Sequence, residues 1–220
     1  MELADDDGLL GVGGLLEPEW LIDAYRHGIF PWPVDSTLAW WSPDPRAVLE
    51  FDGLKVSRRL ARTIRSPRFT VTSNRAFRDV ITACAEVPRD DGGTWITPDM
   101  LAAYCRMHEL GFAHSVEVWR GERLAGGVYG IALGGFFAGE SMFFRETDAS
   151  KVALFHLLRH LTVRGYRLFD LQLLNDHTAR LGGSEIRRRE YLRRLHAAID
   201  LDVSFGDRLE SLPDPSNVPA

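Results

Sequence analysis

The stretch HSVEVWRGERLAGGVYGIALGGFFAGESMFF, residues 114–144, decides the fold. It contains three runs rich in Val, Ile, Phe and Tyr, the residue types that favour strands. Gly-containing turns separate these runs, and WRGERL has the form of a short hairpin. We therefore predict three consecutive strands at the centre of the protein.

Helical and extended segments continue the pattern on both sides of this stretch. Thr97, Pro98 and Gly111 are placed as the N-cap, first position and C-terminal stop of one helix. The order β-α-α-β-β-β-α-β-α predicts an α+β protein with a mixed sheet and flanking helices, rather than repeated βαβ units. The flanking segments are a strand at 69–73, helices at 75–87, 97–111 and 147–165, a strand at 166–174 and a helix at 184–199.

A smaller unit precedes the main domain. The sequence from Pro18 to Gly28 predicts a helix, a Trp- and Pro-rich loop follows, and RAVLEF predicts a short strand. We assign four parts to the chain. They are a small N-terminal domain at 1–56, a basic helix or linker at 57–68, the main domain at 69–205 and a tail at 206–220 that we expect to be mobile.

Composition is that of an ordinary globular protein, with 45% hydrophobic and 26% charged residues among 220. No window approaches the roughly 18 to 20 apolar residues that span a bilayer, and the acidic start is unlike a secretory signal. We expect a cytoplasmic protein with no membrane association. Cys84 and Cys105 lack metal-ligand spacing and are interpreted as buried or idle thiols in a reducing compartment.

Two features of the charge distribution are relevant to nucleic-acid binding. The net charge of −5 argues against a protein that coats nucleic acid over its whole surface. Arg58, Arg62 and Arg65, however, would align on one helical face. Such a face can follow a phosphate backbone, or it can simply be solvated.

The segment LFDLQLL places a carboxylate and an amide on one face of a strand, at Asp170 and Gln172. This pair could grip an amine and a carbonyl, or it could lie exposed at the edge of the sheet. Glu140 lies in an otherwise apolar strand, so it either forms a structural ion pair or binds a cation in a pocket. The segment before His177 favours a helix cap over proton transfer.

Trp32, Trp40 and Trp41 are three of the six tryptophans and lie in the Pro-rich loop. They follow neither a strand nor a helix period, so core packing is not an obvious explanation. Trp95 precedes a helix and is either a platform for a ligand or a hydrophobic staple.

The order of elements resembles the acetyltransferase-like fold of the GNAT superfamily, in which a central strand pair splays apart. Acetyl-CoA enzymes of that fold bind pyrophosphate with a Gly-rich loop before a helix. The corresponding segment here, SMFFRETDASKVALF, has no glycine. Motifs for nucleoside triphosphate, zinc protease and nicotinamide chemistry are also missing from the sequence.

Several longer motifs resemble the leucyl/phenylalanyl-tRNA protein transferase family, in the same order from about residue 8 to about residue 195. GIFPW with WWSPDPR is the most specific of them. The motifs are GLLGVGGLLEPEWLIDAYRHGIFPWP, WWSPDPRAVL, GTWIT, HELGFAHSVEVW, GGVYGIALGGFFAGESMF, ASK and LQLLNDHTARLGGSEIRRREYL.

The resemblance implies an enzyme that moves leucine or phenylalanine, and less well methionine, from Leu-tRNA or Phe-tRNA to proteins that begin with Arg or Lys. The product enters the bacterial N-degron pathway. No metal and no cofactor are implied, because the ester of the aminoacyl-tRNA is already activated. We expect a monomer.

The resemblance also implies roles for individual residues. Asp170, Gln172 and Glu140 match the reaction centre, where Asp170 holds or deprotonates an α-amino group and Glu140 positions a substrate amine. Trp32 and Trp95 match the aromatic residues that bind the terminal adenosine of tRNA. One of Trp40 and Trp41 is expected to pack the small domain onto the large one.

An apolar slot for the donor side chain is implied at Phe137, Val128 and Leu157. Val128 and Leu157 are smaller than the Met and Phe of the family pattern, which predicts a roomier slot. Three other hypotheses stay open: an acyl-CoA N-acyltransferase, a non-catalytic module that binds the tRNA end, and a sister family whose acceptors begin with Asp or Glu.

Overall fold

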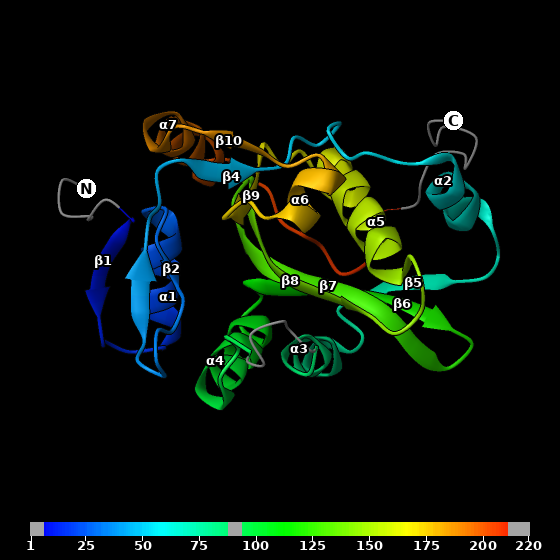
Figure 1. Ribbon diagram of the computed structural model, residues 1–220, viewed down its shortest axis with the longest axis horizontal. Coiled ribbons are helices and arrows are strands. Elements are labelled where there is room, and N and C mark those ends of the chain that lie inside the picture. Colours follow the sequence, from blue (N-terminus) through cyan, green and yellow to red (C-terminus); the bar gives the residue numbers. More distant parts are fainter. Residues whose placement is uncertain (1–6, 88–93, 211–220) are drawn as a thin grey trace.

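The computed structural model describes residues 7–87 and 94–210, and these form an α+β structure. Figure 1 shows a large twisted sheet with helices on both faces and a small unit at one end that contains the first strands and the first helix. The predicted α+β class is confirmed. None of the helices in these residues is long and apolar enough to cross a membrane.

The large sheet has seven strands, and the three strands predicted from residues 114–144 form its centre. Neighbouring strands are antiparallel except for one parallel pair, in which Phe136–Ala138 run beside Leu168–Asp170. Beyond that point β8 and β9 no longer pair, which agrees with the splayed central strands expected from the resemblance to the acetyltransferase-like fold. The order is β10 (Ser184–Ile186), β4 (Arg46–Val48), β9 (Leu168–Gln172), β8 (Phe136–Phe144), β7 (Arg123–Leu133), β6 (Ala113–Arg120) and β5 (Thr70–Ser73).

Helices cover both faces of this sheet. The apolar helix α5 (Ala149–Arg164) lies on one face, and α3 (Phe77–Ala85) and α4 (Pro98–Glu109) lie on the other (Figure 1). Thr97 caps α4 as predicted, because its side chain accepts a hydrogen bond from the backbone N–H of Met100. The remaining helices are α1 (Pro18–Arg26), α2 (Arg58–Arg65), α6 (Asp176–Leu181) and α7 (Arg188–Ile199).

The small unit contains a three-stranded sheet that sequence periodicity did not reveal. Strand β3 (Ala39–Trp41) pairs with β1 (Leu9–Val12) and with β2 (Phe30–Pro31). Trp40 and Trp41 therefore lie on a strand, where their indole N–H groups donate to the backbone carbonyls of Gly13 and Trp32. Strands of two to four residues are too short to show a period, so the sequence pattern does not reveal this pairing.

Two other elements differ from the predictions. The predicted helix at 184–199 begins only at Arg188, because Ser184–Ile186 form β10 against β4. The predicted strand at 166–174 ends at Gln172, and the short helix α6 follows it, with Asn175 as its cap. Both segments lie next to β4, which comes from a distant part of the sequence and pairs with β9 and β10.

The domain limits stay a prediction. Strand β4 lies within 1–56 and pairs in the large sheet, so that segment contributes to both sheets. Of the tail, residues 211–220 lie outside the described ranges, while Glu210 forms an ion pair with Arg164.

Two glycines make room for the aromatic rings under α5. Phe137 stacks on Phe169 with 5.5 Å between ring centroids. A Cβ at Gly130 would lie 2.4 Å from the Phe137 ring and 2.1 Å from the carbonyl oxygen of Ala138, and a Cβ at Gly139 would lie 2.9 Å from the Phe169 ring. The glycines thus permit the close approach of these rings to the sheet.

Gly130→Ala should therefore lower the free energy of unfolding by about 1–3 kcal/mol, because the added methyl group overpacks the sheet against backbone atoms. Gly11→Ala is the matched control, since a Cβ at Gly11 meets no atom within 4 Å. Urea denaturation of both variants measures the difference. Equal stability of the two variants would contradict the packing argument.

Candidate functional site

Three elements, α1, α4 and the central strand β8, bring a carboxylate and two phenols together. The hydroxyl of Tyr25, on α1, is 2.8 Å from Glu140 Oε1, and the hydroxyl of Tyr104, on α4, is 3.1 Å from Glu140 Oε2. The two hydroxyls are also 2.6 Å apart. Both tyrosines are buried, whereas Glu140 is half-buried. Glu140 is thus the part of this group that solvent or a substrate reaches.

A β-bulge aims Glu140 at the phenols. In the β7–β8 ladder Tyr129 pairs with Ser141 and Gly130 pairs with Gly139, so Glu140 is the extra residue of β8. A bulge of this kind bends the strand and redirects one side chain. The sequence position of Glu140 within an apolar strand is explained by this bulge.

Burial raises the pKa of the Glu140 carboxyl to about 7. The hydrogen bonds from Tyr25 and Tyr104 act in the opposite direction, because they stabilise the ionised form. Asp170 raises this pKa further and Arg46 lowers it. A carboxyl with a pKa near neutrality can hold or release a proton in response to a substrate amine.

Gln172 connects Glu140 to the end of β9. Its side-chain Nε2 donates to Glu140 Oε1 at 3.1 Å, and its backbone N–H donates to Asp170 Oδ1 at 2.9 Å. Its backbone adopts φ of 60°, a left-handed conformation that costs free energy for a residue with a side chain. The chain accepts this strain where the amide reaches the carboxylate.

Asp170 is fully buried and forms an ion pair with Arg46, so the alternative of an exposed sheet edge is wrong. Arg46 Nε donates to Oδ1 at 2.9 Å, and Nη2 donates to Oδ2 at 2.6 Å. The hydroxyl of Tyr191 donates to Oδ2, and the backbone N–H of Gln172 donates to Oδ1. Each carboxylate oxygen accepts two hydrogen bonds, which is the arrangement of a positioning group.

Sequence reasoning did not find four members of this cluster: Tyr25, Tyr104, Arg46 and Tyr191. Arg46 had a detectable signal, because it is a charged residue that opens a short apolar strand. Its guanidinium also donates to the carbonyl of Gly28 and lies over the rings of Phe30 and Tyr191. The tyrosines have the spacing of helix core residues and gave no separate signal.

Trp32 and Trp95 lie together, although 62 residues of sequence separate them. Their rings stack with 5.0 Å between centroids and 16° between planes. Trp95 is 8% exposed, whereas Trp32 is half-buried. The two rings are in contact, so no further ring fits between them.

Phe137, Val128 and Leu157 belong to one buried cluster between the sheet and α5, and Leu157 is a residue of that helix. All three are at most 3% exposed. The half-buried Met142 lies opposite Val128 in the β7–β8 ladder. The structure thus brings the three predicted slot residues together as a packed apolar layer.

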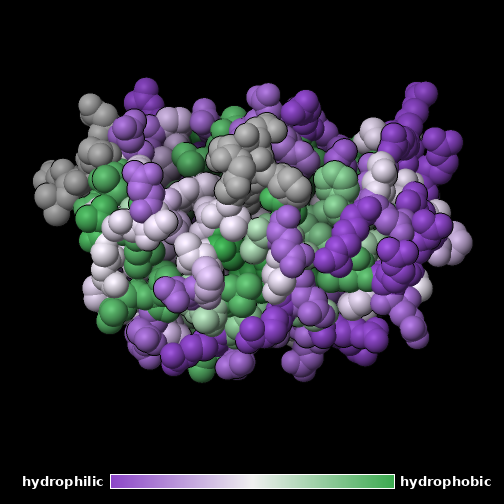
Figure 2. Space-filling model, turned by 60° about the horizontal axis from the view of Figure 1, so that its bottom comes forward, coloured by the Kyte–Doolittle hydropathy of each residue, from purple (hydrophilic) through white to green (hydrophobic). Residues whose placement is uncertain are grey.

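Arg58, Arg62 and Arg65 lie on α2 and are exposed. In Figure 2, hydrophilic side chains gather toward the end of the molecule that carries α2 and the β6–β7 hairpin. His177 lies on α6 outside the Glu140 cluster, directly after the cap Asn175 and the first helical residue Asp176.

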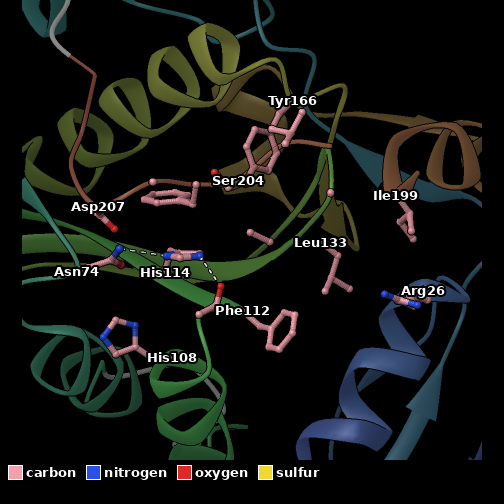
Figure 3. A pocket seen from close by; sticks show the side chains of 16 residues that line it. Arg26, Asn74, His108, Phe112, His114, Leu133, Tyr166, Ile199, Ser204 and Asp207 are labelled. Carbon is pink, nitrogen blue, oxygen red and sulfur yellow. Dashed lines mark hydrogen bonds between the residues drawn. The ribbon is translucent and has the colours of Figure 1, made fainter. Parts of the chain in front are cut away.

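A separate cavity of about 490 Å³ opens near the β7–β8 turn (Figure 3). His114 lies in its wall, where Asn74 Nδ2 is 3.1 Å from Nδ1 and the carbonyl of Gly111 is 3.1 Å from Nε2. Burial lowers the pKa of His114 to about 4, so the ring is neutral and both nitrogens are hydrogen-bonded. None of the predicted site residues lines this cavity.

Arg46→Met should lower the free energy of unfolding by about 3–5 kcal/mol, because it leaves Asp170 buried without its cation. Arg46→Met combined with Asp170→Leu should recover part of this loss. Arg194→Met is the control, since Arg194 pairs with Glu50 at the surface and such pairs contribute at most about 1 kcal/mol. Urea denaturation tests this, and similar losses for Arg46→Met and Arg194→Met would contradict it.

Glu140→Gln should remove a pH dependence of stability. The carboxyl titrates near 4.5 when unfolded and near 7 when folded, so the native state binds this proton more tightly. The stability that comes from the tighter binding of this proton is complete below pH 4.5 and is lost as the pH rises to about 7. Unfolding free energies at about pH 5 and about pH 8 should show that wild type loses stability relative to Glu140→Gln.

The exposed Glu109→Gln variant is the control for this titration. Its stability relative to wild type should not follow the same pH profile. A difference between wild type and Glu140→Gln that is constant across this pH range would overturn the assignment.

Comparison with known proteins supports one family for the whole chain. Residues 48–196 match the family described as leucyl/phenylalanyl-tRNA protein transferase, and residues 14–44 match its N-terminal domain. A protein of Anaeromyxobacter sp. named leucyl/phenylalanyl-tRNA protein transferase is 53% identical, and the match covers 94% of this chain and 92% of that protein. A protein of the same name from Syntrophobacter fumaroxidans is 55% identical, with 94% and 89% covered.

Solved structures are more distant. A structure titled L-PGS from Bacillus licheniformis is 14% identical, with a TM-score of 0.41 and coverage of 73% of this chain and 52% of that one. A GCN5-related N-acetyltransferase-like protein from Streptococcus suis is 13% identical, with a TM-score of 0.35 and coverage of 77% and 64%. The sequence relatives decide the assignment: the chain belongs to the leucyl/phenylalanyl-tRNA protein transferase family.

Proposed function

We propose that this protein transfers leucine or phenylalanine, and less well methionine, from aminoacyl-tRNA to the N-terminal Arg or Lys of acceptor proteins. It would do so as a cytoplasmic monomer without a metal or cofactor, and its products would enter the bacterial N-degron pathway. The observation that carries the proposal is the match to transferases of this name at 53–55% identity over about nine tenths of both chains.

The reaction is the aminolysis of an ester. The acceptor α-amino nitrogen attacks the ester carbonyl, the new C–N bond forms, and the bond to the ribose oxygen breaks. One proton passes from the nitrogen to that ribose oxygen, so the reaction of donor and acceptor balances without an oxidant or a further co-reactant. The enzyme's task is to hold the two reactants in position and to stabilise the developing charge.

Glu140 and Gln172 are the residues that we assign to substrate amines. Glu140 Oε2 accepts one described hydrogen bond, from Tyr104, and has capacity for another donor. Gln172 donates one of its two Nε2–H groups to Glu140. Its amide oxygen is left to orient an amine, and its second Nε2–H is left to polarise a carbonyl. The half-buried position of Glu140 supports this role.

Asp170 acts as a positioning residue in this proposal. Its two oxygens already accept four hydrogen bonds, so they are poorly placed to take a proton from an amine. The carboxylate instead fixes the backbone of Gln172 and, through Arg46, the strand β4. The proton transfer is then left to the reactants, with the ribose hydroxyl as a candidate shuttle.

Trp32 and Trp95 are assigned to the terminal adenosine. A base on the open side of Trp32 would gain about 1–3 kcal/mol from stacking. Trp95 supports the other side of Trp32, and the indole of Trp41 holds the Trp32 carbonyl, so the platform is fixed before the base arrives.

The packed layer of Phe137, Val128 and Leu157 is assigned to the donor side chain, as one wall of its slot. An apolar wall suits Leu and Phe and contributes only about 1–3 kcal/mol to the choice between them. The exposed arginines of α2, Arg58, Arg62 and Arg65, are assigned to the tRNA backbone.

The proposal is tested by transfer of labelled leucine and phenylalanine from charged tRNA to peptides that begin with Arg, Lys, Asp or Ala. Labelled product on the Arg and Lys peptides alone is the expected result. Product on the Asp peptide would place the acceptor choice with the sister family. Binding of charged tRNA without any product would favour the non-catalytic module, and thermal protection by acetyl-CoA would favour the acyl-CoA hypothesis.

A further inference from the structure

A second cavity, of about 710 Å³, lies on the α5 side of the sheet and is not used by the proposed reaction. We call it the cationic pocket. It is formed by the start of α5, by α6 and by the chain that leads into α2. The residues that line it are Lys55, Val56, Ser57, Leu60, Lys151, His177, Arg180 and Leu181.

The side chains that line the cationic pocket carry a net positive charge. Its lining contains three cations, Lys55, Lys151 and Arg180, and no acidic residue. The nearest described ion pair is weak, because Lys151 Nζ is 3.9 Å from Asp148 Oδ1. Arg180 donates its Nε to the backbone carbonyl of Asp176, which does not neutralise it.

His177 lies close enough to Lys151 and Arg180 for both charges to affect its pKa. Burial lowers its pKa first, and the nearby cations Lys151 and Arg180 lower it further. The imidazole is therefore neutral near pH 7 and can donate one N–H to a bound anion. Three cations and a neutral donor around one cavity form a site for a negatively charged group.

The pocket lies between two regions that the proposed function assigns to tRNA. Ser57 lines the pocket and caps α2, whose arginines follow directly. On the other side, α6 begins four residues after Gln172 of the reaction centre. The pocket therefore adjoins α2 on one side and, through α6, the end of the strand that carries Gln172 on the other.

The lining favours a backbone over a base. It contains no tryptophan, tyrosine or phenylalanine on which a base could stack. Leu60 and Leu181 supply apolar surface between the cations. Lysines bind phosphate as point charges and read no sequence, which suits a substrate that is recognised in several tRNA species.

We propose that the cationic pocket binds phosphodiester groups of the donor tRNA between the arginine face of α2 and the 3′ adenosine. This inference rests on the proposed function for the identity of the polyanion. It assigns Lys55, Lys151 and Arg180 to the phosphates and His177 to a hydrogen bond with one of them.

The test compares two donors that differ in phosphate content. Leucyl-tRNA carries the full backbone, whereas 3′-leucyl-adenosine carries no phosphodiester. The Lys151→Gln/Arg180→Gln variant should raise KM for leucyl-tRNA roughly tenfold, and the loss should be confined to this donor. Binding of uncharged tRNA should weaken as well, with the slope of log affinity against log salt reduced by about 1 for each lost phosphate contact.

Three controls separate this result from a structural effect. Lys151→Arg keeps the charge and should retain most of the affinity for tRNA. Arg123→Gln removes an exposed cation on the β6–β7 hairpin, outside the pocket, and should change neither donor. Trp32→Ala should impair both donors, because the adenosine is common to them.

Unchanged tRNA affinity and salt dependence in the double variant would overturn the inference, as would an equal loss with both donors. Failure of the proposed function looks different, because wild type would then transfer leucine from neither donor. The salt dependence of uncharged tRNA binding would still decide the pocket in that case.

Discussion

The buried ion pair between Arg46 and Asp170 holds the site together. Arg46 belongs to β4, which follows the small unit, and Asp170 belongs to β9 of the large sheet. The same guanidinium binds the carbonyl of Gly28, where α1 ends and the tryptophan segment begins. Burial of two charges is costly, and here the guanidinium donates four hydrogen bonds and the carboxylate accepts four. The pair thereby fixes the helix that carries Tyr25 relative to the strand that carries Gln172.

Two departures from regular strand geometry then place the reactive groups. The bulge in β8 turns Glu140 out of the ladder, and the left-handed backbone of Gln172 ends β9 beside it. Tyr25 and Tyr104 close the other side of the carboxylate from α1 and α4. Burial in this setting raises the pKa of Glu140, so geometry and proton affinity have the same origin.

Much of the fold was predictable because its signals are local. The central strands, the cap of α4 at Thr97 and the apolar helix α5 depend on residue types within a few positions of each other. The small sheet and β10 were not predictable, since their strands contain only two to four residues, and β1 and β10 pair with strands distant in sequence. The tyrosine partners of Glu140 were missed for a different reason, because buried tyrosines on a helix have the pattern of core residues.

The sequence by itself determined the α+β class and the family, and it predicted site roles for Glu140, Asp170, Gln172, Trp32 and Trp95. Tertiary structure decided what these residues touch. It stacked Trp32 on Trp95, paired Asp170 with Arg46 and left Glu140 as the half-buried carboxyl of the group. It also gathered Lys55, Lys151 and Arg180 around one cavity. Motifs specify which residues are present, but contacts between distant segments form only when the chain packs, and those contacts set burial and charge.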